Sequence, residues 1–483
     1  MTSALPLGRI GFGCYRVDDE TPGHREALEH ALNAGCTLID TSTNYMDGGS
    51  ERLVGAVLHD LKQRDARRRE RIVVVSKIGY VQGRNLEVAV ERERAGRPFP
   101  EMVRYADGCW HCIHPEFLQD QLARSLERLR SERLDVCLLH NPEYFLSDAA
   151  KSKAKGRGDG GLEASRDEFY RRLRESFAFL EERVRAGVIG HYGVSSNTAV
   201  VPASDPEATS LSRMLEAARA AGGEAHHFRV LQVPMNLFES GAALTPNTGR
   251  GAGQTALEAA SEAGLAVLLN RPLNAFVGGR LLRLAEVAVP PREARLEDVV
   301  AGLRALEQEH EERFAADLTA DGREAASQLF QLTGQVAGLA EQIDDHVHWE
   351  QIAGQYFIPR VNMLVSSLAR SLPPGRGDEW RAWWDRCVPL IGGLVREVGR
   401  GAALKSQGPA RSIAGMLDPL LPEARRRETL SRKALWVLAS TPAVSSVLLG
   451  MRRTEYVEDA MPVFDWEPLG DPLEVLRRFR AAA

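Results

Sequence analysis

Short apolar runs bounded by turn residues recur along the chain, and most precede a stretch in which apolar residues return every three or four positions. Such spacing places the apolar side chains on one face of a helix, as at residues 116–130. Eight strands that alternate with helices predict a parallel sheet with right-handed crossovers, and we expect an α/β fold of the (β/α)8 TIM-barrel type. The expected strands are residues 8–13, 37–40, 72–77, 134–140, 188–194, 229–233, 265–270 and 444–450.

Two intervals depart from this repeat. Residues 147–168 are rich in Lys, Gly, Asp and Ser, which predicts an exposed, mobile loop after the fourth strand. Residues 288–430 carry no strand pattern, and their 3-4 apolar spacing predicts a multi-helix insertion between strand seven and its partner helix, with turns at 373–375 and 407–409. The expected domains are therefore a barrel in residues 1–287 and 431–483, and a helical insertion in residues 288–430.

Composition narrows the functional classes. The 483 residues exceed the roughly 250 of a minimal barrel, which agrees with an insertion. The formal net charge of -5 lacks the excess of positive charge that is typical of nucleic-acid-binding proteins. The chain has no apolar stretch of the roughly 18 residues that a membrane span needs, and its six cysteines do not resemble a disulfide framework. We expect a cytoplasmic protein that binds neither nucleic acid nor membrane.

Four polar residues end, or directly follow, three successive expected strands. Asp40 closes the second strand and Tyr45 lies in the loop after it, while Lys77 and His140 close the third and fourth strands. The carboxyl ends of barrel strands share the face on which barrel enzymes do chemistry. Each of these residues, taken alone, could equally be a helix cap, a surface residue or a structural residue. It is the order and spacing of all four together that indicate a catalytic site.

Together the four residues suit the reduction of a carbonyl group. Hydride addition creates an alkoxide, which needs a proton donor within hydrogen-bond reach. Tyr45 would be that donor, with Lys77 lowering the phenol pKa and Asp40 holding the ammonium in place. A neutral His140 would orient the substrate and donate a second hydrogen bond to the developing oxyanion.

The segment from Asp40 to Tyr45, followed by Gly48-Gly49-Ser50-Glu51 and Gly55, resembles the signature of the aldo-keto reductase family. Lys77 and His140 stand where that family has its Lys and His. The resemblance covers residues 1 to about 285 and about 430 to 468. It implies a TIM barrel, a nicotinamide cofactor bound without a Rossmann domain, and ordered carbonyl reduction.

The resemblance also implies a cofactor site. Residues 191–197 resemble the family's Gly-Val-Ser-Asn motif, and one extra Ser leaves open which residue takes the second role. Asn270 replaces the aromatic ring that stacks on nicotinamide in many members, and Arg452 and Arg453 favour NADPH over NADH, although NADH stays open. The implied cofactor residues are Ser195, Ser196, Asn197, Gln232, Asn270, Arg271, Pro272, Leu273, Gly450, Arg452, Arg453 and Asp459.

Two His-containing clusters invite a metal interpretation, and we expect no metal at either. Cys109, His111, Cys112 and His114 lie too close together to wrap a tetrahedral ion, which leaves loop packing or a redox-active CxxC pair. The residues Asp344, His346, His348 and Glu350 spread around a helix, and only His346 and Glu350 share a face. Trp380, Trp383 and Trp384 predict a buried helix face, with an interface as the alternative.

Two functions stay open from the sequence. The first is an NADPH-dependent oxidoreductase that reduces an aldehyde or ketone, or oxidises the matching alcohol or sugar. The second is a catalytically weak, nucleotide-binding barrel that docks a protein partner through its helical insertion. The complete set of four residues favours the enzyme, whereas Asn270 and the insertion favour the docking module. Because the insertion leaves the carboxyl end of a strand, we expect it to cover or shape the substrate mouth.

Overall fold

The computed structural model describes residues 5–154, 161–343 and 345–482. The chain divides into two compact units, one formed by Met1–Leu284 with Leu420–Ala483 and the other by Ala285–Pro419. The second unit begins a few residues before position 288 and ends about a dozen before position 430, the boundaries expected from sequence. Residues 420–429 contain only short 3₁₀ turns, so their pattern could not be assigned to either unit from sequence.

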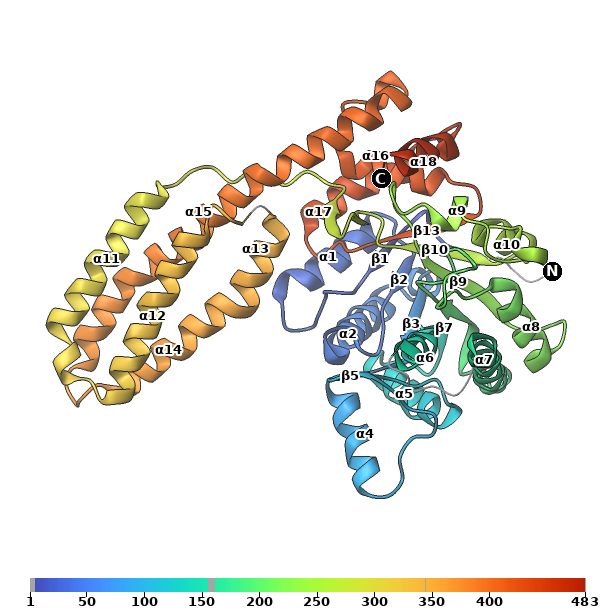
Figure 1. The fold of residues 1–483 in the computed structure, drawn as a ribbon, viewed down its shortest axis with the longest axis horizontal. Coiled ribbons are helices and arrows are strands. Elements are labelled where there is room, and N and C mark those ends of the chain that lie inside the picture. The colour runs from blue at the N-terminus through green and yellow to red at the C-terminus, as the bar shows by residue number, and fades with distance from the viewer. Residues whose placement is uncertain (1–4, 155–160, 344, 483) are drawn as a thin grey trace. The chain divides into compact units, whose positions relative to one another are not determined.

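Eight parallel strands of the first unit close into a barrel, which confirms the predicted TIM-barrel fold (Figure 1). Each expected strand occurs within two residues of its predicted bounds, because alternation of buried residues with turn signals is a local property. In barrel order, the strands are β1 (Ile10–Gly13), β13 (Val444–Leu449), β10 (Ala266–Asn270), β9 (Phe228–Pro234), β8 (Ile189–Ser195), β7 (Leu134–His140), β3 (Val73–Ile78) and β2 (Leu38–Asp40).

Branched apolar side chains fill the barrel interior, including Leu38, Val75, Val136 and Leu268, all almost fully buried. Strands β8 and β9 approach each other unusually closely at Gly193. A Cβ atom at Gly193 would lie 1.8 Å from the backbone oxygen of Val230, so no larger residue fits there. This packing fixes the register that brings Ser195 opposite Gln232 at the open end of the barrel.

Helices follow the strands and begin at recognisable caps. Helix α5 begins after His114, whose ring accepts a hydrogen bond from the backbone nitrogen of Glu116. Helix α10 begins with a capping box between Thr255 and Glu258. Helices of this unit include α1 (Pro22–Asn33), α2 (Gly49–Arg64), α5 (Pro115–Arg128), α7 (Leu162–Arg185), α8 (Leu211–Gly222), α10 (Ala256–Glu262), α16 (Leu430–Ser440), α17 (Thr454–Ala460) and α18 (Pro472–Ala481).

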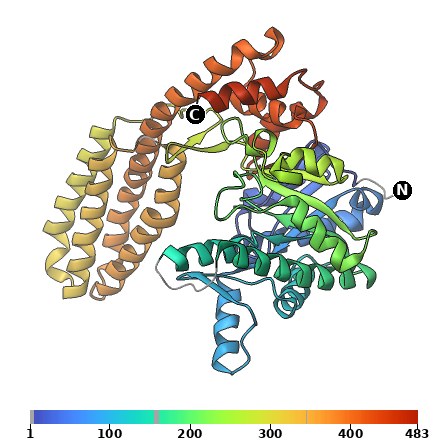
Figure 2. The same cartoon turned by 45° about the vertical axis from the view of Figure 1, so that its right-hand side comes forward.

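Two parts of the barrel unit differ from expectation. The long loop after β3 contains helix α4 (Arg84–Arg94) and an antiparallel sheet ordered β4 (Tyr80–Val81), β6 (Cys109–His111), β5 (Val103–Ala106). Helix α4 stands away from the barrel strands in both views (Figure 1, Figure 2). The predicted loop at 147–168 was wrong where it is described: residues 147–154 lie in α6 (Tyr144–Ala154) and 162–168 in α7, while 155–160 lie outside the described residues. Leu146 and Phe169, which flank this interval, are buried, and their packing anchors the two helices that extend into it.

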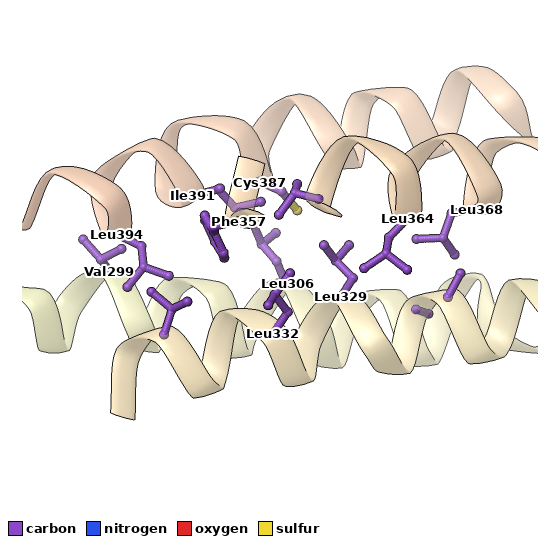
Figure 3. Close-up of a cluster of buried hydrophobic side chains, with 14 of the residues drawn as sticks. Val299, Leu306, Leu329, Leu332, Phe357, Leu364, Leu368, Cys387, Ile391 and Leu394 are labelled. Atoms are coloured by element: carbon purple, nitrogen blue, oxygen red, sulfur yellow. The ribbon is translucent and has the colours of Figure 1, made fainter. Parts of the chain in front are cut away.

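The second unit is a bundle of helices that lie side by side around a continuous apolar core (Figure 1, Figure 3). Trp380 and Trp383 are buried in this core, as the predicted buried helix face requires, and Trp384 is half-buried against it. The predicted turn at 373–375 separates two helices, but the one at 407–409 was wrong, because Pro409 lies inside the longest helix. The helices are α11 (Leu296–Arg313), α12 (Ala320–Leu339), α13 (His346–Ile352), α14 (Ile358–Ser371) and α15 (Gly377–Leu417).

Of the helices in the described ranges, none is long and apolar enough to cross a membrane.

Candidate active site

The barrel brings three of the four candidate catalytic residues into direct contact. The ammonium of Lys77 donates hydrogen bonds to Oδ2 of Asp40 at 2.8 Å and to the hydroxyl of Tyr45 at 3.1 Å. It also donates to the backbone oxygen of Thr41 at 2.8 Å, so all three of its protons have acceptors. Lys77 is fully buried and Asp40 is 4% exposed, so this ion pair lies almost entirely out of water.

Tyr45 is half-buried and begins a short 3₁₀ helix, Tyr45–Gly48. The next two residues, Met46 and Asp47, have left-handed backbones with φ of 48° and 50°, which is strained for residues with a side chain. Asp47 is held in place because its carboxylate accepts a hydrogen bond from the backbone nitrogen of Arg84 at 3.1 Å. This contact anchors the turn that presents Tyr45.

Burial and the neighbouring charge of Lys77 act in opposite directions on the pKa of Tyr45. Burial raises the pKa of Tyr45, and the Lys77 ammonium offsets only part of that effect. The net direction is therefore upward, in contrast to the lowered phenol pKa expected from the sequence. For Lys77 itself, burial disfavours the charge, but the neighbouring Asp40 and Tyr45 outweigh it and raise the pKa. At neutral pH the phenol and the ammonium both keep their protons.

The fourth residue, His140, faces Tyr45 edge-on with ring centroids 5.8 Å apart. Its Nδ1 lies 3.0 Å from the hydroxyl of Ser42. Burial, and then the charge of Lys77, hold the pKa of His140 well below its usual value. The imidazole is therefore neutral, and one of its two nitrogens carries the hydrogen.

A row of polar side chains continues from this group across three neighbouring strand ends. Ser195 donates to Oε1 of Gln232 at 3.0 Å, and Asn270 donates to the same oxygen at 3.4 Å. The amide nitrogen of Gln232 donates to Oδ1 of Asp40 at 2.7 Å. The buried Oδ1 of Asn270 has no partner among the described residues. The row thus joins the expected cofactor residues to the Asp40–Lys77 pair.

Two of the expected cofactor residues, Ser196 and Asn197, lie outside this row of polar side chains. Ser196 accepts hydrogen bonds from the backbone nitrogens of Thr198 and Ala199, both at 3.2 Å, so its hydroxyl organises the following loop. The side chain of Asn197 is exposed, and its backbone nitrogen donates to Oε1 of Glu143 at 2.6 Å. Neither side chain is joined to the Ser195–Gln232 row.

The segment after β10 turns sharply. Arg271 has a left-handed backbone with φ of 55°, and its guanidinium lies 3.6 Å from Glu239. Pro272 and the buried Leu273 lead into an antiparallel hairpin formed by β11 (Asn274–Val277) and β12 (Arg280–Arg283). The hairpin comes directly before the second unit in the chain.

The segment after β13 supplies the remaining expected residues. Gly450 follows the strand, Arg452 lies in the loop, and Arg453 is the residue before α17. Asp459 lies further along α17 and accepts hydrogen bonds from Thr429 and Ser431, at the start of α16. Its carboxylate is therefore engaged in joining two barrel helices.

Comparison with known proteins finds a family similarity for part of this chain. The model of the Aldo/keto reductase family matches residues 9–205, which include Asp40, Tyr45, Lys77 and His140. Over this stretch the chain is similar to the Aldo/keto reductase family. The matched stretch ends before Gln232 and Asn270, so the second half of the polar row lies outside it.

The chain is similar to several curated oxidoreductases of this kind and spans about half the length of each. An uncharacterised oxidoreductase of Bacillus subtilis is 24% identical over 198 residues, which is 40% of this chain and 47% of the relative. The NAD(P)H-dependent D-xylose reductase of Scheffersomyces stipitis is 25% identical over 202 residues, 41% and 51% of the two chains. The NADH-specific methylglyoxal reductase of Escherichia coli is 26% identical over 185 residues, 34% and 51%.

Solved structures of aldo-keto reductases align with most of this chain at low sequence identity. A Bacillus halodurans enzyme in its holo form is 14% identical with a TM-score of 0.46, covering 99% of this chain and 93% of that one. A Klebsiella pneumoniae enzyme in complex with NADP and acetate is 17% identical with a TM-score of 0.43, covering 98% and 92%.

The sequence analysis did not predict a group of aromatic and polar side chains that lies beside His140. The ring of Tyr80 lies 4.6 Å from that of His140, and its hydroxyl accepts from Asn141 at 2.8 Å and donates to Tyr144 at 3.1 Å. His111 contacts the backbone oxygen of His140 at 2.7 Å. Tyr80 and His111 belong to the added sheet after β3. The only sequence signal for the position of Tyr80 was that it follows Lys77 by three residues in the chain.

Cys109 and Cys112 are both free thiols in this structure. Cys109 is half-buried and begins β6, and the buried Cys112 directly follows the strand. The redox-active pair considered from sequence stays a prediction. In the described part of the chain, no group of three or more His, Cys, Asp or Glu side chains is placed to hold a metal ion.

The second His-containing cluster lies in the helical unit. Nδ1 of His346 lies 3.0 Å from the backbone oxygen of Gly399, and Nε2 lies 3.9 Å from Glu350. The contact with Gly399 packs α13 against α15, whereas Glu350 lies one turn along α13 itself. Asp344, the first residue of the expected cluster, lies outside the described residues.

Proposed function

We propose that this chain is an NADPH-dependent oxidoreductase that reduces an aldehyde or ketone, or oxidises the corresponding alcohol, with Tyr45 as the proton donor. The observation that carries the proposal is the single ammonium of Lys77 bonded to both Asp40 and Tyr45. Its similarity to the Aldo/keto reductase family over residues 9–205, and to reductases of D-xylose and methylglyoxal, supports small carbonyl compounds as the substrate class.

The proton step follows from the arrangement of these residues. The carbonyl carbon gains a hydride and its oxygen becomes an alkoxide, which takes the proton from the Tyr45 hydroxyl. The phenolate left on Tyr45 is stabilised by the adjacent Lys77 ammonium, whose charge is balanced by Asp40. Tyr45 is half-buried, so its hydroxyl can recover a proton from water after the product leaves. The product is the alcohol, with one hydride and one proton added.

His140 orients the substrate in this proposal. As a neutral imidazole it can donate one hydrogen bond to the carbonyl oxygen without competing with Tyr45 as an acid. The edge-on contact between the two rings supports the proposal that both donors serve the same carbonyl oxygen. A second donor at a developing oxyanion contributes about 10²–10³ to the rate in other enzymes.

The polar row fits a nicotinamide cofactor, which supplies the hydride when bound. Ser195, Gln232 and Asn270 present hydroxyl and amide groups at adjacent strand ends, and the unpartnered Oδ1 of Asn270 suits the donor of a carboxamide. Arg452 and Arg453, in the loop after β13, would take the 2′-phosphate of NADPH. Ser196, Asn197, Arg271, Pro272, Leu273, Gly450 and Asp459 stay expected cofactor residues.

The test is fluorescence titration with NADPH and NADH, followed by turnover of a carbonyl panel that includes D-xylose and methylglyoxal. We expect tighter binding of NADPH, turnover by the native chain, and a loss of about 10²–10⁴-fold in Tyr45→Phe with unchanged cofactor affinity. Cofactor binding without any turnover would favour the docking function of the helical unit. Absence of cofactor binding would overturn the proposal.

A further inference from the structure

A continuous chain of hydrogen bonds connects His140 to the added sheet after β3. Nδ1 of His140 lies 3.0 Å from Oγ of Ser42, and that hydroxyl lies 2.7 Å from Oδ1 of Asn44. Nδ2 of Asn44 lies 3.1 Å from Oε1 of Gln82, whose Nε2 lies 3.2 Å from Sγ of Cys109. Ser42 is fully buried and Asn44, Gln82 and Cys109 are half-buried, so the chain runs from the candidate site toward the surface.

Such a chain has two complete arrangements, because a half-turn of an amide exchanges its donor and acceptor ends. In the first, Gln82 donates to Cys109, Asn44 donates to Gln82 and Ser42 donates to Asn44. The Ser42 oxygen must then accept from His140, which puts the imidazole hydrogen on Nδ1. In the second arrangement every bond is reversed, Ser42 donates to Nδ1, and the imidazole hydrogen lies on Nε2.

Only one hydrogen is available to the ring, since burial and the Lys77 charge keep the imidazole neutral. The Ser42 hydroxyl has one other nearby acceptor, the backbone oxygen of Lys77 at 3.2 Å. That oxygen already accepts from the backbone nitrogen of Thr43 at 3.1 Å and from the Thr43 hydroxyl at 3.2 Å, which fills its two lone pairs. The hydroxyl hydrogen of Ser42 therefore goes either to Asn44 or to His140.

We propose that Ser42, Asn44 and Gln82 are positioning residues that set the tautomer of His140, and that turnover uses the arrangement in which Ser42 donates to Nδ1. The inference rests on the proposed function, because a hydrogen on Nε2 is what a carbonyl oxygen beside Tyr45 requires. Among the described residues, no hydrogen bond to Nε2 of His140 is found, so that nitrogen is available to a substrate.

The decisive comparison is between two substitutions of Asn44. In Asn44→Asp the carboxylate only accepts, so Ser42 must donate to it and His140 is fixed with its hydrogen on Nδ1. In Asn44→Leu, which has a similar volume, neither end exists and Ser42 is free to donate to His140. We expect kcat to fall about 100-fold in Asn44→Asp and to stay within about threefold of native in Asn44→Leu, with KM little changed in both. A purely structural role predicts the opposite order.

Gln82 provides the same comparison farther from the site. Gln82→Glu can only accept from Asn44, which turns the Asn44 oxygen toward Ser42 and again fixes the hydrogen on Nδ1. Gln82→Leu removes that constraint. The same order, Glu worse than Leu, is expected at both positions, so a folding defect in one variant does not decide the outcome. Equal effects of the charged and apolar variants at both positions would overturn the proposal.

A readout that needs no turnover separates this inference from the proposed function. Ring ¹⁵N spectra of His140, measured with NADP⁺ present and assigned with a His140→Ala variant, report which nitrogen carries hydrogen and whether both do. We expect hydrogen on Nδ1 in Asn44→Asp and on Nε2 in Asn44→Leu. The same tautomer in both variants would refute the chain even if the enzyme is active. If no carbonyl is reduced, the proposed function fails while the spectra still decide this inference.

Discussion

Gln232 donates a hydrogen bond of 2.7 Å to Oδ1 of Asp40, although the two residues are 192 positions apart in the chain. The other oxygen of the same carboxylate accepts from Lys77 at 2.8 Å. Asp40 therefore belongs to both the candidate catalytic group and the polar row expected to hold nicotinamide. If cofactor binding moved the Gln232 amide, the hydrogen bonding of Asp40 would change, and with it the ion pair between Asp40 and Lys77 beside Tyr45.

Removal of Lys77 should destabilise the fold as well as abolish activity. Lys77→Met leaves the buried Asp40 carboxylate without its cation, and we expect a loss of about 3–5 kcal/mol in the free energy of unfolding. The double variant Asp40→Asn with Lys77→Met removes the unpaired charge and should recover part of that loss. Urea unfolding of Lys77→Met, Asp40→Asn and the double variant measures this, and a strictly additive double variant would contradict coupling of the pair.

Gln232 should matter for cofactor affinity and Ser196 should not. Gln232→Leu removes one side of the polar row and the donor to Asp40, so we expect a Kd for NADPH about tenfold higher, equivalent to one hydrogen bond. Ser196→Ala is the matched control, because its hydroxyl serves the backbone of the following loop. Fluorescence titration compares them, and a larger effect of Ser196→Ala would reverse the assignment.

Glu143 should make stability fall as pH rises. Burial raises the pKa of this carboxyl to about 7 from 4.5, so the folded chain holds a proton that the unfolded chain has lost between these values. The stabilisation is complete below pH 4.5 and declines by about 3 kcal/mol as pH rises to 7. Glu143→Gln should therefore raise the melting temperature at pH 8 and give no gain at pH 4. Thermal unfolding across this range checks the slope, and an equal shift at every pH would count against it.

His310 should weaken the helical unit, most of all in acid. Both of its ring nitrogens are buried without a partner in the described chain, between the rings of Phe314, Phe330 and Trp383. Burial lowers its pKa to about 4, so below pH 6.5 the unfolded chain takes up a proton that the folded chain refuses, and stability declines as pH falls.

His310→Leu removes both unpartnered groups, and we expect a gain of about 1–3 kcal/mol that is larger at pH 5 than at pH 8. Hydrogen exchange of the α11 amides in the full-length protein reports this unit directly. A loss of protection at both pH values would mean that the ring packs better than leucine.

Local patterns were enough to predict the barrel and the position of the four candidate catalytic residues in it. Buried strands alternate with amphipathic helices over short distances, and Asp40, Lys77 and His140 each end an apolar run, so all three must lie at one end of a closed parallel barrel. The direct contact of Lys77 with Asp40 and Tyr45 then follows from adjacent strands.

What the sequence by itself determined is the set of elements whose signal is contained in a few neighbouring residues: the eight strands, their partner helices and the polar residues at the strand ends. Only the tertiary structure decided that Gln232 bonds to Asp40, that Asp459 joins two helices, that Tyr80 and His111 lie beside His140, and that Pro409 continues a helix. The physical reason is that each of these depends on a contact between distant segments. Burial and hydrogen-bond satisfaction across such contacts outweigh local propensity, and no short window of sequence records them.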